Sequence, residues 1–317
     1  IFGSGRNVGS ALVSHPRVKA VGFTGSTSGG TALMNLASKR SEPIPVYAEM
    51  GSVNPVFILS EALTEQSGSI ASGLYASTTM GVGQFCTNPG LVMVQQGREG
   101  DAFKENFAKY MREHGDGIML NRSIQKAYCE GVTSRKNNDN VEVIVSSKMD
   151  DESGPCLGST AVFQVTTMQF LDDSSLSHEI FGPGTTLIRY TSKDELLKIA
   201  ENMTGQLTAT VYGSEADLNE HTELIAILER KVGRLLFNGF PTGVEVCSSM
   251  VHGGPFPATS DGRSTSVGTY AIDRFTRLVA YQNCPQSLLP DELKNDNPLN
   301  ISRMINGQIT HDGVDII

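Results

Sequence analysis

The sequence predicts an α/β fold built around a doubly wound, largely parallel sheet. Short apolar runs typical of strands alternate along the chain with longer amphipathic stretches typical of helices. The earliest of these strands leads through a turn of Gly and Ser into a helix, as in βαβ units. The chain has 317 residues, 39% of them hydrophobic, so it is long enough to bury a substantial core and to form two domains.

The first 50 residues are predicted to contain half of a parallel βαβ unit. A Gly turn opens a short helix that stops at Pro16, and a buried strand follows at residues 18–24. Ser26 is placed to cap the next helix, and a second strand at residues 43–48 ends at Glu49. Ligand sites of open α/β sheets lie at the carboxyl ends of such strands, so we expect one here.

The rest of the sheet is predicted from the alternation that continues after residue 50. An apolar segment at residues 270–283 predicts a further helix or strand, and a polar tail follows from residue 290. The Gly- and Pro-rich stretch after residue 250 predicts a loop that crosses back over a site. The expected strands are residues 54–59, 91–95, 141–145, 161–167, 185–190, 207–212 and 233–238, and the expected helices are residues 70–80, 101–114, 121–136, 194–202 and 218–231.

Composition excludes several classes of protein. A net charge of -9 disfavours nucleic-acid binding, which needs clustered Lys and Arg. No apolar run approaches the ~20 residues that span a bilayer, and no signal peptide is expected. The cysteines form no CxxC pair and no metal-ligand spacing, so no metal site is expected, and their free thiols suit a reducing, cytoplasmic environment. They are Cys86, Cys129, Cys156, Cys247 and Cys284.

Cys86 is the candidate nucleophile. It lies in Gly83-Gln84-Phe85-Cys86-Thr87, a Gly-rich loop without charged residues. Exposed backbone N–H groups in such a loop can stabilise a thiolate and the oxyanion of a tetrahedral intermediate. A buried structural cysteine is the commoner fate of a lone thiol, and the residues alone leave that alternative open.

Glu49 is the candidate general base. It lies in Ala48-Glu49-Met50-Gly51, between apolar neighbours at the end of a strand. Burial there is expected to raise its pKa towards the range useful for a base. The alternative is that Glu49 is an ordinary solvated charge at the end of a strand.

Three further segments carry polar groups with a possible function. Thr24-Gly25-Ser26 offers backbone and hydroxyl donors at a helix N-terminus, which suits a pyrophosphate, although a plain helix cap is the alternative. Glu179 precedes a turn and could equally be an exposed charge. His252, before Gly253, is either a surface histidine or a neighbour of Cys86 that influences its ionisation.

Four segments, taken in order, resemble motifs of the aldehyde dehydrogenase superfamily. The resemblance runs from residue 1 to about residue 285 and is closest to the branch of α-ketoglutaric semialdehyde and NADP-dependent fatty aldehyde dehydrogenases. It implies a parallel doubly wound catalytic domain plus part of a Rossmann-like cofactor domain. The segments are Phe23-Thr24-Gly25-Ser26, Ala48-Glu49-Met50-Gly51, Gly83-Gln84-Phe85-Cys86 and Glu179-Ile180-Phe181-Gly182-Pro183.

The resemblance implies oxidation of an aldehyde, a semialdehyde or aliphatic one, to a carboxylic acid by NAD or NADP. Cys86 matches the thiol that forms a thiohemiacetal and then a thioester, and Glu49 matches the base that activates water. Ser52 and Val53 depart from the family motif, which has Gly and often Lys there. These departures bear on which branch of the family the chain resembles, and they do not affect the match of the Glu49 carboxylate.

The resemblance also implies the residues of the cofactor site and the substrate pocket. No GxGxxG motif occurs, so the cofactor assignment depends on the family. Phe85 and His252 are expected in the aldehyde pocket. The cofactor residues implied are Thr24, Gly25 and Ser26 near the phosphates, Glu179 at the nicotinamide ribose and Phe181 beside the nicotinamide ring.

The expected domain organisation has four parts. Residues 1–50 are the C-terminal part of a cofactor domain, and residues 51–250 form the thiol-bearing catalytic domain. Residues 251–285 return to the cofactor domain, and residues 286–317 form a tail with a possible role in oligomerisation. The family's oxyanion Asn and cofactor Lys would lie upstream of Ile1. We therefore expect a fragment with little activity, and a homodimer or homotetramer at full length.

Two alternatives to a dehydrogenase remain. A Cys-dependent hydrolase or acyltransferase would use the same thiol and base without a cofactor, although it has no reason to carry the segment around Glu179. A non-catalytic remnant with a structural role is the other alternative. Retention of Cys86 and Glu49 argues against it.

Overall fold

The computed structural model describes residue 3, residues 5–146 and residues 154–314. The chain divides into two compact units, Ile1–Arg274 and Phe275–Ile317. No helix in the described part of the chain combines the length and the apolar character needed to cross a membrane.

The first unit begins with a complete parallel βαβ unit, which includes both predicted strands and the helix between them. A π-helical turn (Gly5–Gly9) and α1 (Ser10–Ser14) precede β1 (Val21–Thr24), α2 (Thr27–Ser38) and β2 (Val46–Glu49). β1 and β2 pair in parallel with Thr24 opposite Glu49, so both residues lie at the carboxyl ends of their strands.

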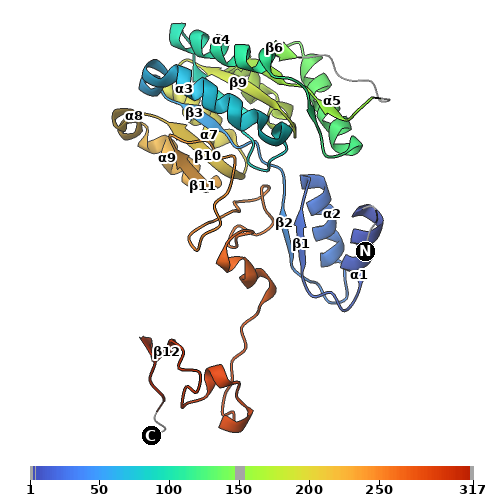
Figure 1. Ribbon diagram of the computed structural model, residues 1–317, viewed down its shortest axis with the longest axis vertical. Helices are drawn as coiled ribbons and strands as arrows, with labels where there is room; N and C mark the ends of the chain where they lie inside the picture. Colours follow the sequence, from blue (N-terminus) through green and yellow to red (C-terminus); the bar gives the residue numbers. More distant parts are fainter. Residues whose placement is uncertain (1–2, 4, 147–153, 315–317) are drawn as a thin grey trace. The chain divides into compact units, whose positions relative to one another are not determined.

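A seven-stranded sheet forms the body of the first unit (Figure 1). Its strands are parallel except for the edge strand β6, which runs antiparallel to β8. The central strands β9 and β10 are buried along their whole length, as expected for a parallel sheet covered on both faces. In spatial order the strands are β11 (Val232–Phe237), β10 (Gln206–Tyr212), β3 (Val56–Ile58), β4 (Leu91–Gln95), β9 (Gly184–Tyr190), β8 (Ala161–Thr166) and β6 (Glu142–Ser146).

Successive strand residues point to opposite sides of the sheet, so both of its faces carry apolar side chains. Helices cover both faces. Val56 and Ile58 pack in one core cluster with α3 (Ser60–Thr79) and α4 (Arg98–Glu113), whereas Phe57 packs in the other. That second cluster contains apolar residues of α5 (Arg122–Lys136), α6 (Thr167–Asp172), α7 (Lys193–Asn202) and α9 (Thr222–Glu229). The doubly wound α/β prediction is confirmed.

Long-range contacts explain where the predicted helices differ from the observed ones. α3 begins at Ser60, ten residues before the predicted start of residue 70. The carboxylate of Asp217 accepts hydrogen bonds from the backbone N–H groups of Glu61 and Ala62, so a residue far along the chain caps this helix. The single helix predicted at residues 218–231 is divided at His221 into α8 (Glu215–Glu220) and α9.

Several smaller elements were not predicted. β5 (Gly117–Ile118) and β7 (Leu157–Gly158) form a short antiparallel pair, and α6 extends directly from β8. The prediction of a helix or strand at residues 270–283 that packs apolar surface is wrong. Only the 3₁₀ turn Thr269–Phe275 forms there, and Leu278 is fully exposed.

The second unit is mostly irregular within the described residues. It contains 3₁₀ turns at Gln286–Leu288 and Asp291–Leu293, and the hairpin β12 (Arg303–Ile305) and β13 (Gln308–Thr310). Asn306 and Gly307 join the two strands with φ of 49° and 83°, the left-handed conformation that tight hairpin turns need.

Candidate active site

The loop that carries Cys86 follows a turn of unusual backbone conformation. After α3, residues Gly81, Val82 and Gly83 have φ of 57°, 59° and 65° in succession. A β-branched residue rarely adopts this left-handed conformation. Val82 fits because Gly117 faces it, where an added Cβ would lie 2.5 Å from Val82 Cγ2. The strand pair β5–β7 thereby helps to hold the turn that leads to the thiol.

The thiol loop packs backbone to backbone against the segment that contains Glu179 and Phe181. A Cβ added to Gly83 would lie 2.2 Å from the carbonyl of Gly182, and Asn88 Nδ2 donates to Gly182 O at 3.1 Å. The structure therefore brings together two of the segments selected from the sequence.

The loop of residues 252–267 lies beside the end of β2. Met50 N donates to Ala258 O at 2.8 Å, and Ser260 N donates to Ala48 O at 2.9 Å. Glu49 and Thr259 form an isolated antiparallel bridge. The predicted loop that crosses back over a site is therefore present.

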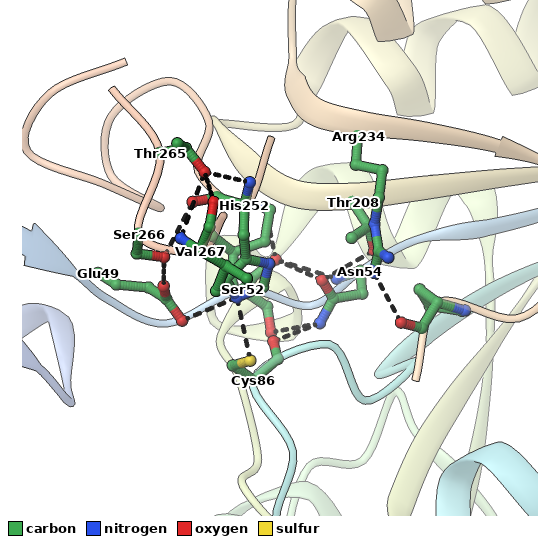
Figure 2. Close-up of polar contacts among 12 residues, drawn as sticks. Glu49, Ser52, Asn54, Cys86, Thr208, Arg234, His252, Thr265, Ser266 and Val267 are labelled. Carbon is green, nitrogen blue, oxygen red and sulfur yellow. Dashed lines mark hydrogen bonds and ion pairs between the residues drawn. The ribbon is translucent and has the colours of Figure 1, made fainter. Parts of the chain in front are cut away.

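This loop places His252 between Cys86 and Glu49 (Figure 2). His252 Nε2 lies 3.4 Å from Cys86 Sγ and 3.1 Å from Glu49 Oε1. Ser266 Oγ donates to the other carboxylate oxygen, Glu49 Oε2, at 2.5 Å. His252 and Glu49 are buried, and Cys86 is half-buried. The alternative of a surface histidine at position 252 is excluded by this burial.

The pKa values of the two buried groups favour an ion pair. Burial raises the pKa of Glu49, but hydrogen bonds from His252 and Ser266 outweigh it and hold the pKa below its usual value. Burial lowers the pKa of His252, but its contacts with Cys86 and Glu49 outweigh that effect and raise the pKa to about 9. The expected rise in the Glu49 pKa is therefore wrong. At neutral pH an imidazolium faces the sulfur and can hold negative charge there.

Asn54, which the sequence analysis did not select, ties the thiol loop to the sheet. Its Nδ2 donates to Cys86 O and to Asn88 O, both at 2.9 Å. Its Oδ1 accepts from Ser52 Oγ at 2.9 Å and from Thr208 Oγ1 at 3.0 Å. Ser52, the departure from the family motif, is thus part of a buried hydrogen-bond network. The only local signal for Asn54 was its position before a proline.

The predicted cofactor residues lie near Gly51. Thr24, Gly25 and Ser26 are exposed at the start of α2, where Ser26 Oγ accepts from Gly29 N at 3.2 Å, and Gly25 N donates to Glu49 O at 3.1 Å. A Cβ added to Gly51 would lie 2.7 Å from Glu179 Oε2 and 3.3 Å from Thr27 Oγ1. The Glu179 carboxylate and the start of α2 therefore converge on this glycine.

Glu179 is exposed as a residue, although its carboxylate lies close to loop atoms near Gly51. Burial among loop atoms raises the pKa of Glu179 to about 7, and the Ser52 backbone opposes this. Because Glu179 is exposed, solvent weakens this rise in pKa.

The two aromatic residues predicted near the site have different surroundings. The Phe85 ring covers Gly81, where an added Cβ would meet it at 2.6 Å, and 36% of Phe85 is exposed beside the thiol. Phe181 is half-buried in the segment that packs on the thiol loop. Their contacts with substrate and cofactor stay predictions.

Comparisons with known proteins agree with this fold. The model of the aldehyde dehydrogenase family matches residues 1–280. The chain is 46% identical over 308 residues to α-ketoglutaric semialdehyde dehydrogenase 2 of Azospirillum brasilense, and 48% identical over 314 residues to α-ketoglutaric semialdehyde dehydrogenase of Acinetobacter baylyi. These alignments cover 97% and 98% of this chain and 58% of each relative, so the chain spans little more than half of their length.

Solved structures share the fold at lower identity. An NAD-dependent aldehyde dehydrogenase from Sinorhizobium meliloti has a TM-score of 0.70 and 23% identity, covering 87% of this chain and 53% of that one. The γ-glutamyl-γ-aminobutyraldehyde dehydrogenase of Burkholderia cenocepacia has a TM-score of 0.71 and 20% identity, covering 84% and 52%. The predicted resemblance is confirmed: this chain belongs to the aldehyde dehydrogenase family.

Proposed function

We propose that the full-length protein containing this chain oxidises an aldehyde to a carboxylic acid with NAD or NADP, using Cys86 as the nucleophile. The contact of His252 with both Cys86 Sγ and Glu49 Oε1 is the observation that carries this proposal. It brings a thiol, an imidazole and a carboxylate together in a protein of the aldehyde dehydrogenase family. Covalent catalysis on a carbonyl carbon needs such a set.

The start of α2 and the Glu179 carboxylate fit a dinucleotide. Gly51 leaves the space between them open, because any side chain there would approach Glu179 Oε2. Exposed N–H groups at the start of a helix of 12 residues suit a pyrophosphate. Bound there, NAD(P)+ would supply the acceptor for the hydride that leaves the substrate carbon.

The residues of this chain perform the covalent steps. Cys86 Sγ bonds to the aldehyde carbon as a thiolate beside the His252 imidazolium, its proton having left to solvent, so that Glu49 stays ionised. Loss of hydride from the thiohemiacetal gives a thioester on Cys86. Water then attacks the thioester carbon, and the Glu49 carboxylate takes its proton and returns it to the departing sulfur. Breaking the C–S bond releases the acid and restores the thiol.

A semialdehyde is the proposed substrate. Two relatives that are 46% and 48% identical are α-ketoglutaric semialdehyde dehydrogenases. We expect the full-length protein to have a higher kcat/KM for α-ketoglutaric semialdehyde than for an unsubstituted aliphatic aldehyde of similar length. Equal values would contradict the semialdehyde assignment and leave the dehydrogenase assignment intact.

The proposal is tested by following NADH or NADPH formation when aldehyde is added to the purified full-length protein. Cys86→Ala should abolish it. Glu49→Gln should give a burst of reduced cofactor followed by slow turnover, because the thioester forms but is hydrolysed slowly. Hydrolysis of a nitrophenyl ester without any cofactor-dependent oxidation would instead support the hydrolase alternative.

A further inference from the structure

The three groups of the candidate active site also match the ligands of a soft divalent cation. A sulfur, an imidazole nitrogen and a carboxylate oxygen, from Cys86, His252 and Glu49, all lie within 4.8 Å of one another. We propose that these residues form a reversible binding site for Zn²⁺, which blocks the thiol while it is bound. Binding depends only on the triangle formed by these three ligand atoms and does not depend on the proposed dehydrogenase activity.

Two of the three separations between these atoms fit tetrahedral coordination, and the third is at most 4.8 Å. With Zn–S of about 2.3 Å and Zn–N or Zn–O of about 2.0–2.1 Å, tetrahedral angles place S and N about 3.6 Å apart and N and O about 3.4 Å apart. The observed separations are 3.4 Å for Cys86 Sγ to His252 Nε2 and 3.1 Å for His252 Nε2 to Glu49 Oε1. A cation could therefore enter with small side-chain adjustments.

The charges of the site also suit a divalent ion. On binding, Zn²⁺ displaces the protons of Cys86 and His252, and the resulting thiolate, carboxylate and neutral imidazole sum to two negative charges, which the ion neutralises. Glu49 and His252 are 5% and 3% exposed, so uncompensated charge would be unfavourable there. The half-buried Cys86 leaves one side of the triangle open, where water can supply a fourth ligand.

The surroundings of the triangle hold two of the ligands in place. Ser266 Oγ donates to Glu49 Oε2 and to the backbone carbonyl of His252 at 2.9 Å, and Thr265 Oγ1 accepts from His252 N at 2.9 Å. His252 Nδ1 is buried without a hydrogen-bond partner in the described structure. Structural zinc sites usually satisfy that nitrogen, so we expect weaker and reversible binding here.

Ion binding and catalysis compete for the same electron pairs. The sulfur that attacks a carbonyl carbon and the imidazole beside it are both ligands of the ion. Zn²⁺ should therefore inhibit any reaction of Cys86, including alkylation by a small reagent.

The first test measures metal binding directly with the full-length protein, free of affinity tags. Zn²⁺ is titrated against a chromophoric chelator, and Co²⁺ is used as a spectroscopic substitute. We expect reversible binding of one ion and a thiolate-to-Co²⁺ charge-transfer band. Cys86→Ser should remove the band, and His252→Gln and Glu49→Gln should each lower the affinity at least ~10-fold. Cys129→Ser, which changes a half-buried cysteine on α5, is the matched control and should bind like the unaltered protein.

The second test needs no variant and so is independent of folding defects. Zn²⁺ should slow alkylation of Cys86 by iodoacetamide, read by mass spectrometry of the peptide that contains it, and EDTA should restore the rate. An unchanged alkylation rate at saturating Zn²⁺ would overturn the proposal. So would an affinity that Cys86→Ser leaves intact.

Discussion

At the scale of single residues, His252 decides the character of the site. Without it, Cys86 would be a half-buried thiol, and Glu49 would be a carboxylate bonded to Ser266. One imidazole nitrogen, 3.4 Å from the sulfur and 3.1 Å from the carboxylate, connects the two groups. The ionisation of this residue should therefore be measurable in the stability of the protein.

We predict a pH-dependent stabilisation by the pair of His252 and Glu49. The pKa of His252 rises from 6.5 to about 9 on folding, so its contribution is complete below pH 6.5 and is lost as the pH rises through 9. The pKa of Glu49 falls below 4.5, so its contribution is present above pH 4.5 and is lost in stronger acid. The difference in Tm between the unaltered protein and His252→Gln should be largest between these limits and shrink towards pH 9. A difference that grows with pH would contradict the ion pair.

We also predict that Asn54 is a positioning residue for the thiol. Asn54→Asp places a buried carboxylate opposite the carbonyl oxygens of Cys86 and Asn88, which should destabilise the protein by about 3 kcal/mol or more. Urea unfolding measures this change. Thr208→Val removes only the donor to Asn54 Oδ1 and should cost about 1 kcal/mol. Equal losses for the two variants would show that the Asn54 amide has no special role.

Sequence reasoning selected the candidate reacting residues but not the residues that hold them in place. Cys86, Glu49 and His252 could be selected because motifs and neighbouring glycines mark them. Asn54 and Ser266 were not selected, because their partners lie 32 to 217 positions away along the chain. The direction of the Glu49 pKa was wrong for the same reason. The burial of Glu49, which raises its pKa, could be predicted from neighbouring residues. The hydrogen bonds from His252 and Ser266, which lower the pKa by more, could not.

At the scale of secondary-structure elements, the buried strands were predicted most accurately. β4 has the predicted bounds, and β9 and β10 each begin one residue early. Their segments are rich in β-branched and apolar residues, which favour strands. Helix ends were predicted less well where distant groups determine them. The start of α3 depends on Asp217, which no local pattern near Ser60 could reveal.

The contact between the thiol loop and the Gly182 segment gives a prediction at this scale. Gly83→Ala introduces a Cβ 2.2 Å from the Gly182 carbonyl at φ of +65°, so the two segments must separate. We expect a loss of about 3 kcal/mol or more in unfolding free energy, together with slower alkylation of Cys86.

Gly243→Ala is the matched control for backbone strain alone. Gly243 has φ of +98°, and an added Cβ would meet nothing within 4 Å. This variant should lose only about 1 kcal/mol and leave the reactivity of Cys86 unchanged. If the two alanine variants behaved alike, steric separation of the segments would not be the cause.

At the scale of the whole molecule, the site depends on contacts between distant parts of the first unit. The amide of Ala48 donates to Ser260 Oγ across 212 positions, whereas α3 and α4 pack as near neighbours in sequence. Closing so long a loop is unfavourable until the sheet provides a surface for it. The fold class could be predicted from repeated local patterns, but the contact that closes this long loop could not.

We predict that the loop of residues 252–267 is the last part of the site to fold. In pulsed hydrogen exchange during refolding, the amides of Met50 and Ser260, which bond across this closure, should gain protection after those of α3 and α4. Simultaneous protection would contradict the predicted order.

The position of His252 in the chain also has a consequence for synthesis on the ribosome. Cys86 leaves the ribosomal tunnel 166 residues before His252. Until then the nascent polypeptide carries its thiol without the imidazole that would make it reactive. The contact can therefore form only after His252 has emerged, and until then the growing chain is protected from any modification that depends on it.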